Sequence, residues 1–113
     1  MSIVTYRKIR RELYLKIPDS LRVGGVYYRI LCNKDSDFEL GHDLDGDFNE
    51  DKARIRLRST VLPARLSEIF IHEIIHAVDC VYGAGQELTE NQTIGLTHGL
   101  YQVLSDMGIG FTL

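Results

Sequence analysis

A long apolar stretch between Pro63 and Gly83 constrains the fold of this chain more than any other feature. Leucine, isoleucine, valine and phenylalanine recur through it on almost every side of a helix, which is typical of a helix that is buried. Proline is favoured as the first residue of a helix, and glycine commonly ends one. The stretch therefore predicts one long buried helix that begins at Pro63 and ends at Gly83.

A second helix is predicted after a flexible break at Gly83-Ala84-Gly85. Thr89 is followed three residues later by Gln92, and this pairing is the capping box that starts many helices. Apolar residues then continue at helical spacing as far as Gly108, where the helix is expected to stop.

The first half of the chain predicts short strands, because alternating, β-branched and aromatic residues gather there between turn residues. The predicted strands are residues 12–17, 21–23, 26–31 and 53–58. Gly24-Gly25 predicts a hairpin turn between the second and third strands. Strands followed by two helices indicate an α+β fold, with a small antiparallel or mixed sheet packed on a two-helix hairpin.

Two further features of this half concern charge. Residues 33–51 are polar and rich in aspartate, and this composition predicts a solvated acidic loop. In the strand 53–58, arginines alternate with Ile55 and Leu57. Charged side chains commonly protect an exposed sheet edge from unwanted pairing, so this strand is predicted to lie at an edge.

Length and composition narrow the class of protein. The 113 residues predict a single domain over 1–113, and a formal net charge of -3 argues against nucleic-acid binding as the function. Two cysteines are too few for a disulfide framework. The start of the chain, including residues 6–16, is charged and lacks the apolar core of a signal peptide, and no apolar run could cross a membrane. We expect a cytoplasmic protein with no membrane partner.

The motif His72-Glu73-Ile74-Ile75-His76 carries the chemistry of the first predicted helix. Histidines four residues apart lie on one helix face, where both imidazoles can bind the same zinc ion. Glu73 beside them can take a proton from a water molecule that zinc acidifies toward a pKa of about 7. Without a metal, these three polar side chains would cost several kcal/mol on a buried apolar helix. The motif therefore predicts Zn²⁺ as cofactor, His72 and His76 as ligands and Glu73 as general base.

The spacing of residues in the sequence does not identify the third zinc ligand. The extended pattern that adds a third histidine to this motif fails, because Asp79 and Tyr82 occupy its glycine and histidine positions. Glu90 at the start of the second helix is one candidate ligand. Asp79, on the same helix face as His72 and His76, is a second candidate, although we expect it to orient a ligand histidine and not to bind zinc itself. His98, two turns past Glu90, is the remaining candidate.

An oxyanion formed during hydrolysis needs a hydrogen-bond donor. His98 and Tyr101 are both candidates for this catalytic role, and the sequence assigns it to neither.

The segment from Leu66 to Asp106 resembles small phage- and prophage-encoded zinc metallopeptidases of the gluzincin-like group that includes the ImmA/IrrE proteins. The residues that carry the resemblance are HEIIHAVD (72–79), LTE (88–90) and GLYQVLSDMG (99–108), with VGGVYYRI, ELGH and ARIRL before them. The likeness covers most of the chain. His98-Gly99 departs from that pattern and is more distantly similar to the third-ligand His-Gly of SprT-like proteases, although the spacing here is longer.

The resemblance implies a minimal zincin-like domain. In that family the two motif histidines bind zinc, the glutamate between them is the general base, and a glutamate that opens the next helix completes the site. Carried over, these residues are His72, His76, Glu73 and Glu90. The resemblance also implies that the ARIRL strand is the sheet edge along which an extended peptide lies.

We therefore expect a zinc metallopeptidase that hydrolyses a peptide or protein substrate. A chain this short can build little wall around a specificity pocket, so a particular regulatory protein is a more natural target than general digestion. The alternative is a zinc-stabilised regulatory or protein-binding module of phage origin that catalyses nothing.

Overall fold

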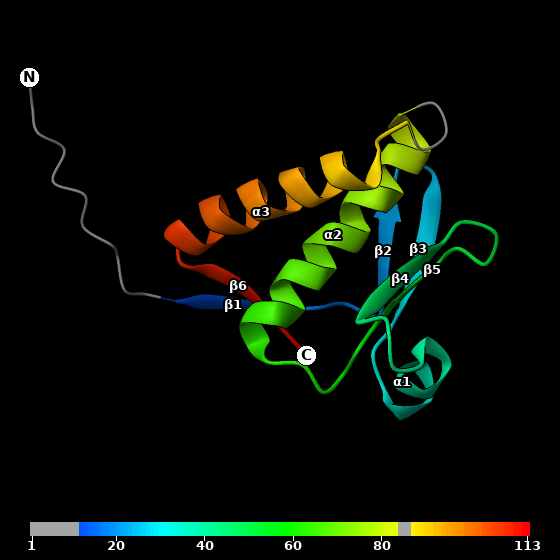
Figure 1. The fold of residues 1–113 in the computed structure, drawn as a ribbon, viewed down its shortest axis with the longest axis horizontal. Helices are drawn as coiled ribbons and strands as arrows, with labels where there is room; N and C mark the ends of the chain where they lie inside the picture. The colour runs from blue at the N-terminus through cyan, green and yellow to red at the C-terminus, as the bar shows by residue number, and fades with distance from the viewer. Residues whose placement is uncertain (1–11, 84–86) are drawn as a thin grey trace, which may run out of the picture.

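The computed structural model describes residues 12–83 and 87–113, and within them the chain has an α+β fold (Figure 1). The elements in chain order are β1 (Leu13–Lys16), β2 (Ser20–Val23), β3 (Val26–Leu31), α1 (Lys34–Leu40), β4 (Gly46–Asn49), β5 (Arg54–Leu57), α2 (Pro63–Tyr82), α3 (Glu90–Asp106) and β6 (Ile109–Thr112). The break predicted at 83–85 falls largely on residues outside the described part, as does most of the charged N-terminal segment.

Both predicted long helices are confirmed. Pro63 is the first residue of α2 and Gly83 is its C-cap. Thr89 caps α3 by accepting a hydrogen bond from the backbone N–H of Gln92, whose side chain in turn accepts from the Thr89 N–H. The two helices lie against each other, and α2 runs between α3 and the larger sheet (Figure 1).

The larger sheet has the strand order β2-β3-β5-β4. The predicted hairpin is confirmed, since β2 and β3 are antiparallel and Val23 pairs with Val26 across the turn. β5 is parallel to β3 and antiparallel to β4, so the sheet is mixed. The prediction that the strand 53–58 lies at a sheet edge is wrong, because β5 has a neighbour on each side and β4 forms that edge.

The acidic segment 33–51 is also not the solvated loop that its composition predicted, because it contains α1 and β4. Its carboxylates neutralise the outward arginines of the β5 region. Arg56 donates to both oxygens of Asp47 and to Glu39 Oε2 at 2.8 Å. Arg58 lies 3.4 Å from Asp45. The arginine face that suggested an exposed edge is therefore covered by acidic side chains that the sequence placed in a loop.

A second sheet, of two strands, lies at the end of α2 away from Gly83. β6 was not predicted; it pairs in parallel with β1. Ser67 on α2 accepts a hydrogen bond of 2.8 Å from the Phe111 N–H, and the Phe111 ring packs edge-on against Phe70. β1 is a strand as predicted, but Leu13 and Leu15 are exposed, and only Ile17 of that alternating set enters the core.

The main core lies between α2 and the four-stranded sheet. Ile55 and Leu57 of β5 are fully buried there, together with Ala77 of α2. None of the helices in the described ranges combines the length and the apolar character needed to cross a membrane.

We expect Gly24→Ala in the β2–β3 turn to lower the free energy of unfolding by about 2 kcal/mol or more. Gly24 has φ +59°, which L side chains adopt at a cost, and an added Cβ would lie 2.6 Å from Val81 Cγ1. Gly25→Ala is the matched control, because its added Cβ would have no atom of residues 12–83 or 87–113 within 4 Å. Chemical denaturation of both variants measures the difference, and equal destabilisation by the two would contradict this account.

Candidate metal centre

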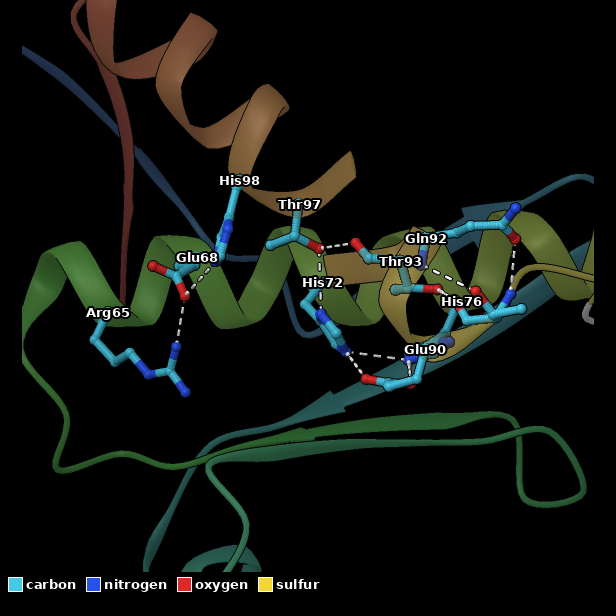
Figure 2. Close-up of polar contacts among 10 residues, drawn as sticks. Arg65, Glu68, His72, His76, Glu90, Gln92, Thr93, Thr97 and His98 are labelled. Carbon is cyan, nitrogen blue, oxygen red and sulfur yellow. Dashed lines mark hydrogen bonds and ion pairs between the residues drawn. The ribbon is translucent and has the colours of Figure 1, made fainter. Parts of the chain in front are cut away.

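Three side chains from two helices converge on one point. His72 and His76 extend from α2, and Glu90 reaches them from the first turn of α3 (Figure 2). His72 Nε2 lies 3.0 Å from Glu90 Oε1, His76 Nε2 lies 3.5 Å from Glu90 Oε2, and the two Nε2 atoms are 3.2 Å apart. The packing of α3 on α2 therefore brings Glu90 to two histidines that precede it by eighteen and fourteen positions in the sequence.

These separations allow a test of whether zinc fits. In a tetrahedral site with bonds of about 2.0–2.1 Å, neighbouring ligand atoms are separated by roughly 3.3–3.4 Å. The two histidine nitrogens are 3.2 Å apart, and they lie 3.0 and 3.5 Å from different oxygens of Glu90, so the observed distances fall on both sides of this value. Two imidazole nitrogens and a carboxylate oxygen are also a common ligand set of catalytic zinc. The site thus fits a zinc ion in both spacing and donor chemistry.

Glu73 lies beside this point without being its nearest carboxylate. One ligand atom from each of His72, Glu73 and His76 lies within 4.8 Å of the others, so Glu73 could by proximity also bind a metal. Glu90, however, places one oxygen against each histidine. Glu73 is 4% exposed, and its Oε2 has no hydrogen-bond partner among the residues that the structure describes. This geometry favours Glu90 as the third ligand and leaves Glu73 with a free oxygen.

The surroundings of Glu73 change how it holds a proton. Burial, assisted by the negative charges of Asp47 and Glu90, raises the pKa of Glu73 to about 8. Gly46 of β4 permits this burial, since a Cβ there would lie 2.5 Å from Ile69 Cγ2 and 3.4 Å from Glu73 Cγ. The carboxyl is thus a group that readily accepts a proton.

His76 is held from the opposite wall by Phe48 of β4. Their rings lie nearly parallel, with centroids 6.4 Å apart and planes 14° apart. Burial and the neighbouring His72 lower the pKa of His76, although Glu90 and Asp79 act in the opposite direction. A lowered pKa favours the neutral imidazole, which is the form that binds a metal.

The point of convergence opens into a cleft of about 740 Å³. One wall is β4 with the residues just before it, and the other is built by α2 and α3. Apolar side chains in the lining are Leu44, Phe48, Ile69 and Ile94. β4 is thus both the edge strand of the larger sheet and a wall of the cleft.

The remaining predicted site residues fall in different places. Asp79 is buried and accepts a 3.1 Å hydrogen bond from the Leu88 N–H, so it ties the start of the α3 segment to α2. Among the hydrogen bonds of the described residues, none joins Asp79 to His72 or His76, and its role in orienting a ligand histidine stays a prediction. Its carboxylate is directed to the backbone that leads into α3 instead.

His98 and Tyr101 are separated by the structure. His98 lines the cleft, with Nε2 3.9 Å from Glu68 Oε1, and is too far along α3 to join the three convergent atoms (Figure 2). Tyr101 lines a different cavity, next to Tyr14 and Ser67. Its side of α3 faces the two-stranded sheet, so the structure does not place Tyr101 where it could stabilise an oxyanion in the cleft.

No family model, curated protein or solved structure matches this chain. The site is therefore interpreted from its own residues and distances.

Sequence reasoning missed two residues that contact the histidines. Phe48 lies in the segment predicted to be a loop. Thr97 is buried on α3 and lies 3.2 Å from His72 Nδ1 through its hydroxyl oxygen. Thr97 comes seven residues after Glu90, hence on the same helix face, and this spacing was a signal that could have found it. Phe48 had no such signal, because its position depends on how the sheet meets α2.

Proposed function

We propose that this chain is a zinc-dependent hydrolase, and specifically a peptidase, in which His72, His76 and Glu90 hold the metal. The observation that carries the proposal is the spacing of their donor atoms, 3.0, 3.2 and 3.5 Å, at the floor of a cleft. The resemblance of the HEIIHAVD segment to small phage metallopeptidases supports the same assignment. In this proposal the α2–α3 pair on its mixed sheet is a minimal zincin-like domain.

Glu73 is the general base in this proposal. A zinc ion held at this site would supply Lewis acidity, which polarises a carbonyl group and acidifies water. The positive charge of such an ion would favour the ionised form of Glu73. In that form the carboxylate can accept a proton from a water molecule in the cleft through Oε2, which has no hydrogen-bond partner among the described residues. The same carboxyl can then donate that proton to the amine that leaves when the peptide bond breaks. Its burial favours the protonated intermediate state, which makes Glu73 suited to carry the proton between the two steps.

An extended peptide fits along β4 better than along β5. Edge strands offer unpaired backbone N–H and C=O groups to a peptide that adds to the sheet, and β4 forms the edge next to the cleft. Leu44, Phe48 and Ile94 supply apolar contacts in the lining. A cleft of about 740 Å³ accommodates a few side chains, which favours a narrow target, such as a particular regulatory protein.

A second function uses the same metal without catalysis. The proposed ligands come from both α2 and α3, so zinc would hold the two helices together, as structural zinc does in small domains. The chain would then be a zinc-stabilised regulatory or protein-binding module. A module that only binds zinc does not need a buried carboxylate whose Oε2 has no hydrogen-bond partner among the described residues. For this reason we favour the hydrolase.

Two measurements test the proposal. Purified protein should contain about one zinc ion per chain by elemental analysis, as a single three-ligand site requires. It should also cleave members of a proteome-derived peptide library, detected by mass spectrometry, and a zinc chelator should abolish this cleavage until zinc is restored. Protein that takes up no zinc even on reconstitution would refute both functions. Zinc without any cleavage would favour the binding module.

A further inference from the structure

Thr97 makes two hydrogen-bonding contacts through a single buried hydroxyl. The residue is 2% exposed in the middle of α3. Its Oγ1 lies 2.7 Å from the backbone carbonyl oxygen of Thr93, one turn earlier, and 3.2 Å from Nδ1 of His72 on α2 (Figure 2). Because Thr97 is almost fully buried, these two contacts determine where the hydroxyl hydrogen points.

The number of available hydrogens decides which group donates and which accepts in each of the two contacts. A hydroxyl carries one hydrogen, and a carbonyl oxygen can only accept. The 2.7 Å contact to Thr93 O therefore uses the Thr97 hydrogen. The Thr97 oxygen is left as an acceptor, and the contact with His72 is a hydrogen bond only if Nδ1 carries a hydrogen and donates it. The chain of donors then runs from His72 through Thr97 to the Thr93 carbonyl.

The donation from Nδ1 to Thr97 determines which nitrogen of His72 keeps a lone pair that can bind a metal. A neutral imidazole carries its hydrogen on one nitrogen and a lone pair on the other. With the hydrogen on Nδ1, the lone pair is on Nε2, the atom that lies 3.0 Å from Glu90 Oε1 and 3.2 Å from His76 Nε2. The free lone pair thus points to the place where the three proposed ligand atoms converge.

We propose that Thr97 is a positioning residue of the metal centre, whose hydroxyl holds His72 in the Nδ1–H tautomer and presents Nε2 to zinc. The inference rests on the proposed zinc site but not on catalysis. The residue that orients His72 is then Thr97 on α3, whereas the sequence led us to expect Asp79 on α2 in this role. The Thr93 carbonyl polarises the Thr97 hydroxyl, so the two hydrogen bonds strengthen each other.

The test compares Thr97→Val with Thr97→Ser and Thr93→Val. Thr97→Val keeps the volume but loses the hydroxyl, and it is expected to weaken zinc binding by about 10–100-fold, as loss of a second-shell partner does. Thr97→Ser keeps the hydroxyl and should bind zinc like the parent. Thr93→Val is the matched control: it removes an equally buried hydroxyl from the same face of α3 but leaves the Thr93 carbonyl in place. Competition with a chelating dye measures the affinities.

A second measurement reports the tautomer itself. In nitrogen-labelled, zinc-loaded parent protein, NMR should show a His72 Nδ1–H that exchanges slowly with water, and this hydrogen should exchange faster in Thr97→Val, which lacks the acceptor. Undiminished zinc affinity in Thr97→Val, an equal loss in Thr93→Val, or a parent protein without a protected Nδ1–H would each overturn the inference while leaving the zinc site intact. A parent protein that binds no zinc would overturn the proposed function and this inference together.

Discussion

Replacing Glu73 with glutamine is expected to lower kcat/KM for any peptide that the parent protein cleaves by about 10²–10⁴-fold, which is the usual contribution of a general acid–base group. Glutamine has nearly the same shape, but its amide cannot accept and return a proton. The carboxyl of Glu73 is 4% exposed, and its Oε2 has no hydrogen-bond partner among the described residues. Among the described residues that line the cleft, no other carboxylate is both buried and unpaired in this way. Steady-state kinetics on a peptide recovered from the library measures the loss.

Zinc content distinguishes loss of the base from loss of the site. Because Glu90 lies nearer to both histidines, Glu73→Gln should retain its zinc. Glu68→Gln makes the same charge change earlier on α2, where the carboxylate is held by Arg65 at 2.6 Å, and we expect a far smaller effect on the rate. A zinc-loaded Glu73→Gln protein as active as the parent would show that the hydrolase mechanism is wrong.

Replacing Glu90 with alanine is expected to weaken zinc binding by more than about 100-fold. This exceeds the usual 10–100-fold effect of a second-shell residue because a direct ligand is lost. Glu90 supplies the carboxylate whose two oxygens lie 3.0 and 3.5 Å from the histidine nitrogens. It is the one proposed ligand outside α2, so the variant should also lose the stabilisation that zinc gives to the contact between α2 and α3. Thermal unfolding with and without zinc measures this second effect.

Variants of His98 and Asp79, the two other candidates for the third zinc ligand, test the assignment of Glu90. His98→Ala should change zinc affinity little, because His98 contacts Glu68 and not the convergent atoms. Asp79→Asn keeps an oxygen that can accept from the Leu88 N–H, and it should bind zinc almost as the parent does. If His98→Ala lost zinc and Glu90→Ala kept it, the assignment of Glu90 as ligand would have to be abandoned.

The fold was predictable where local chemistry decides it. Pro63, Gly83 and the Thr89–Gln92 capping box mark helix ends through backbone groups within one turn, and all three are found where the sequence placed them. The Gly24-Gly25 turn was predictable for the same reason. The order of strands was not, because β5 pairs in parallel with β3 across more than twenty intervening residues. No local pattern records such a pairing.

The acidic segment shows why composition misled. A row of arginines on β5 and a row of aspartates before it each look solvent-exposed when they are considered alone. Asp47 is directly opposite Arg56 in the β4–β5 ladder, and the two side chains neutralise each other. A charged side chain is expected to be exposed to solvent unless an opposite charge lies beside it in the fold. Here the opposite charge lies on the adjacent strand, and the sequence alone does not show that pairing.

The sequence by itself determined that His72, Glu73 and His76 share one region of a buried helix, because a spacing of four residues places two histidines on one face whatever surrounds them. Only the tertiary structure decided what meets them there. The packing of α3 on α2 brought Glu90 to the histidines, left His98 in the cleft and turned Tyr101 away, although all three residues lie on the same helix. It also placed the Thr97 hydroxyl behind His72. Helical spacing fixes direction within one helix, but contact between two helices depends on their packing angle and depth, which no local pattern encodes.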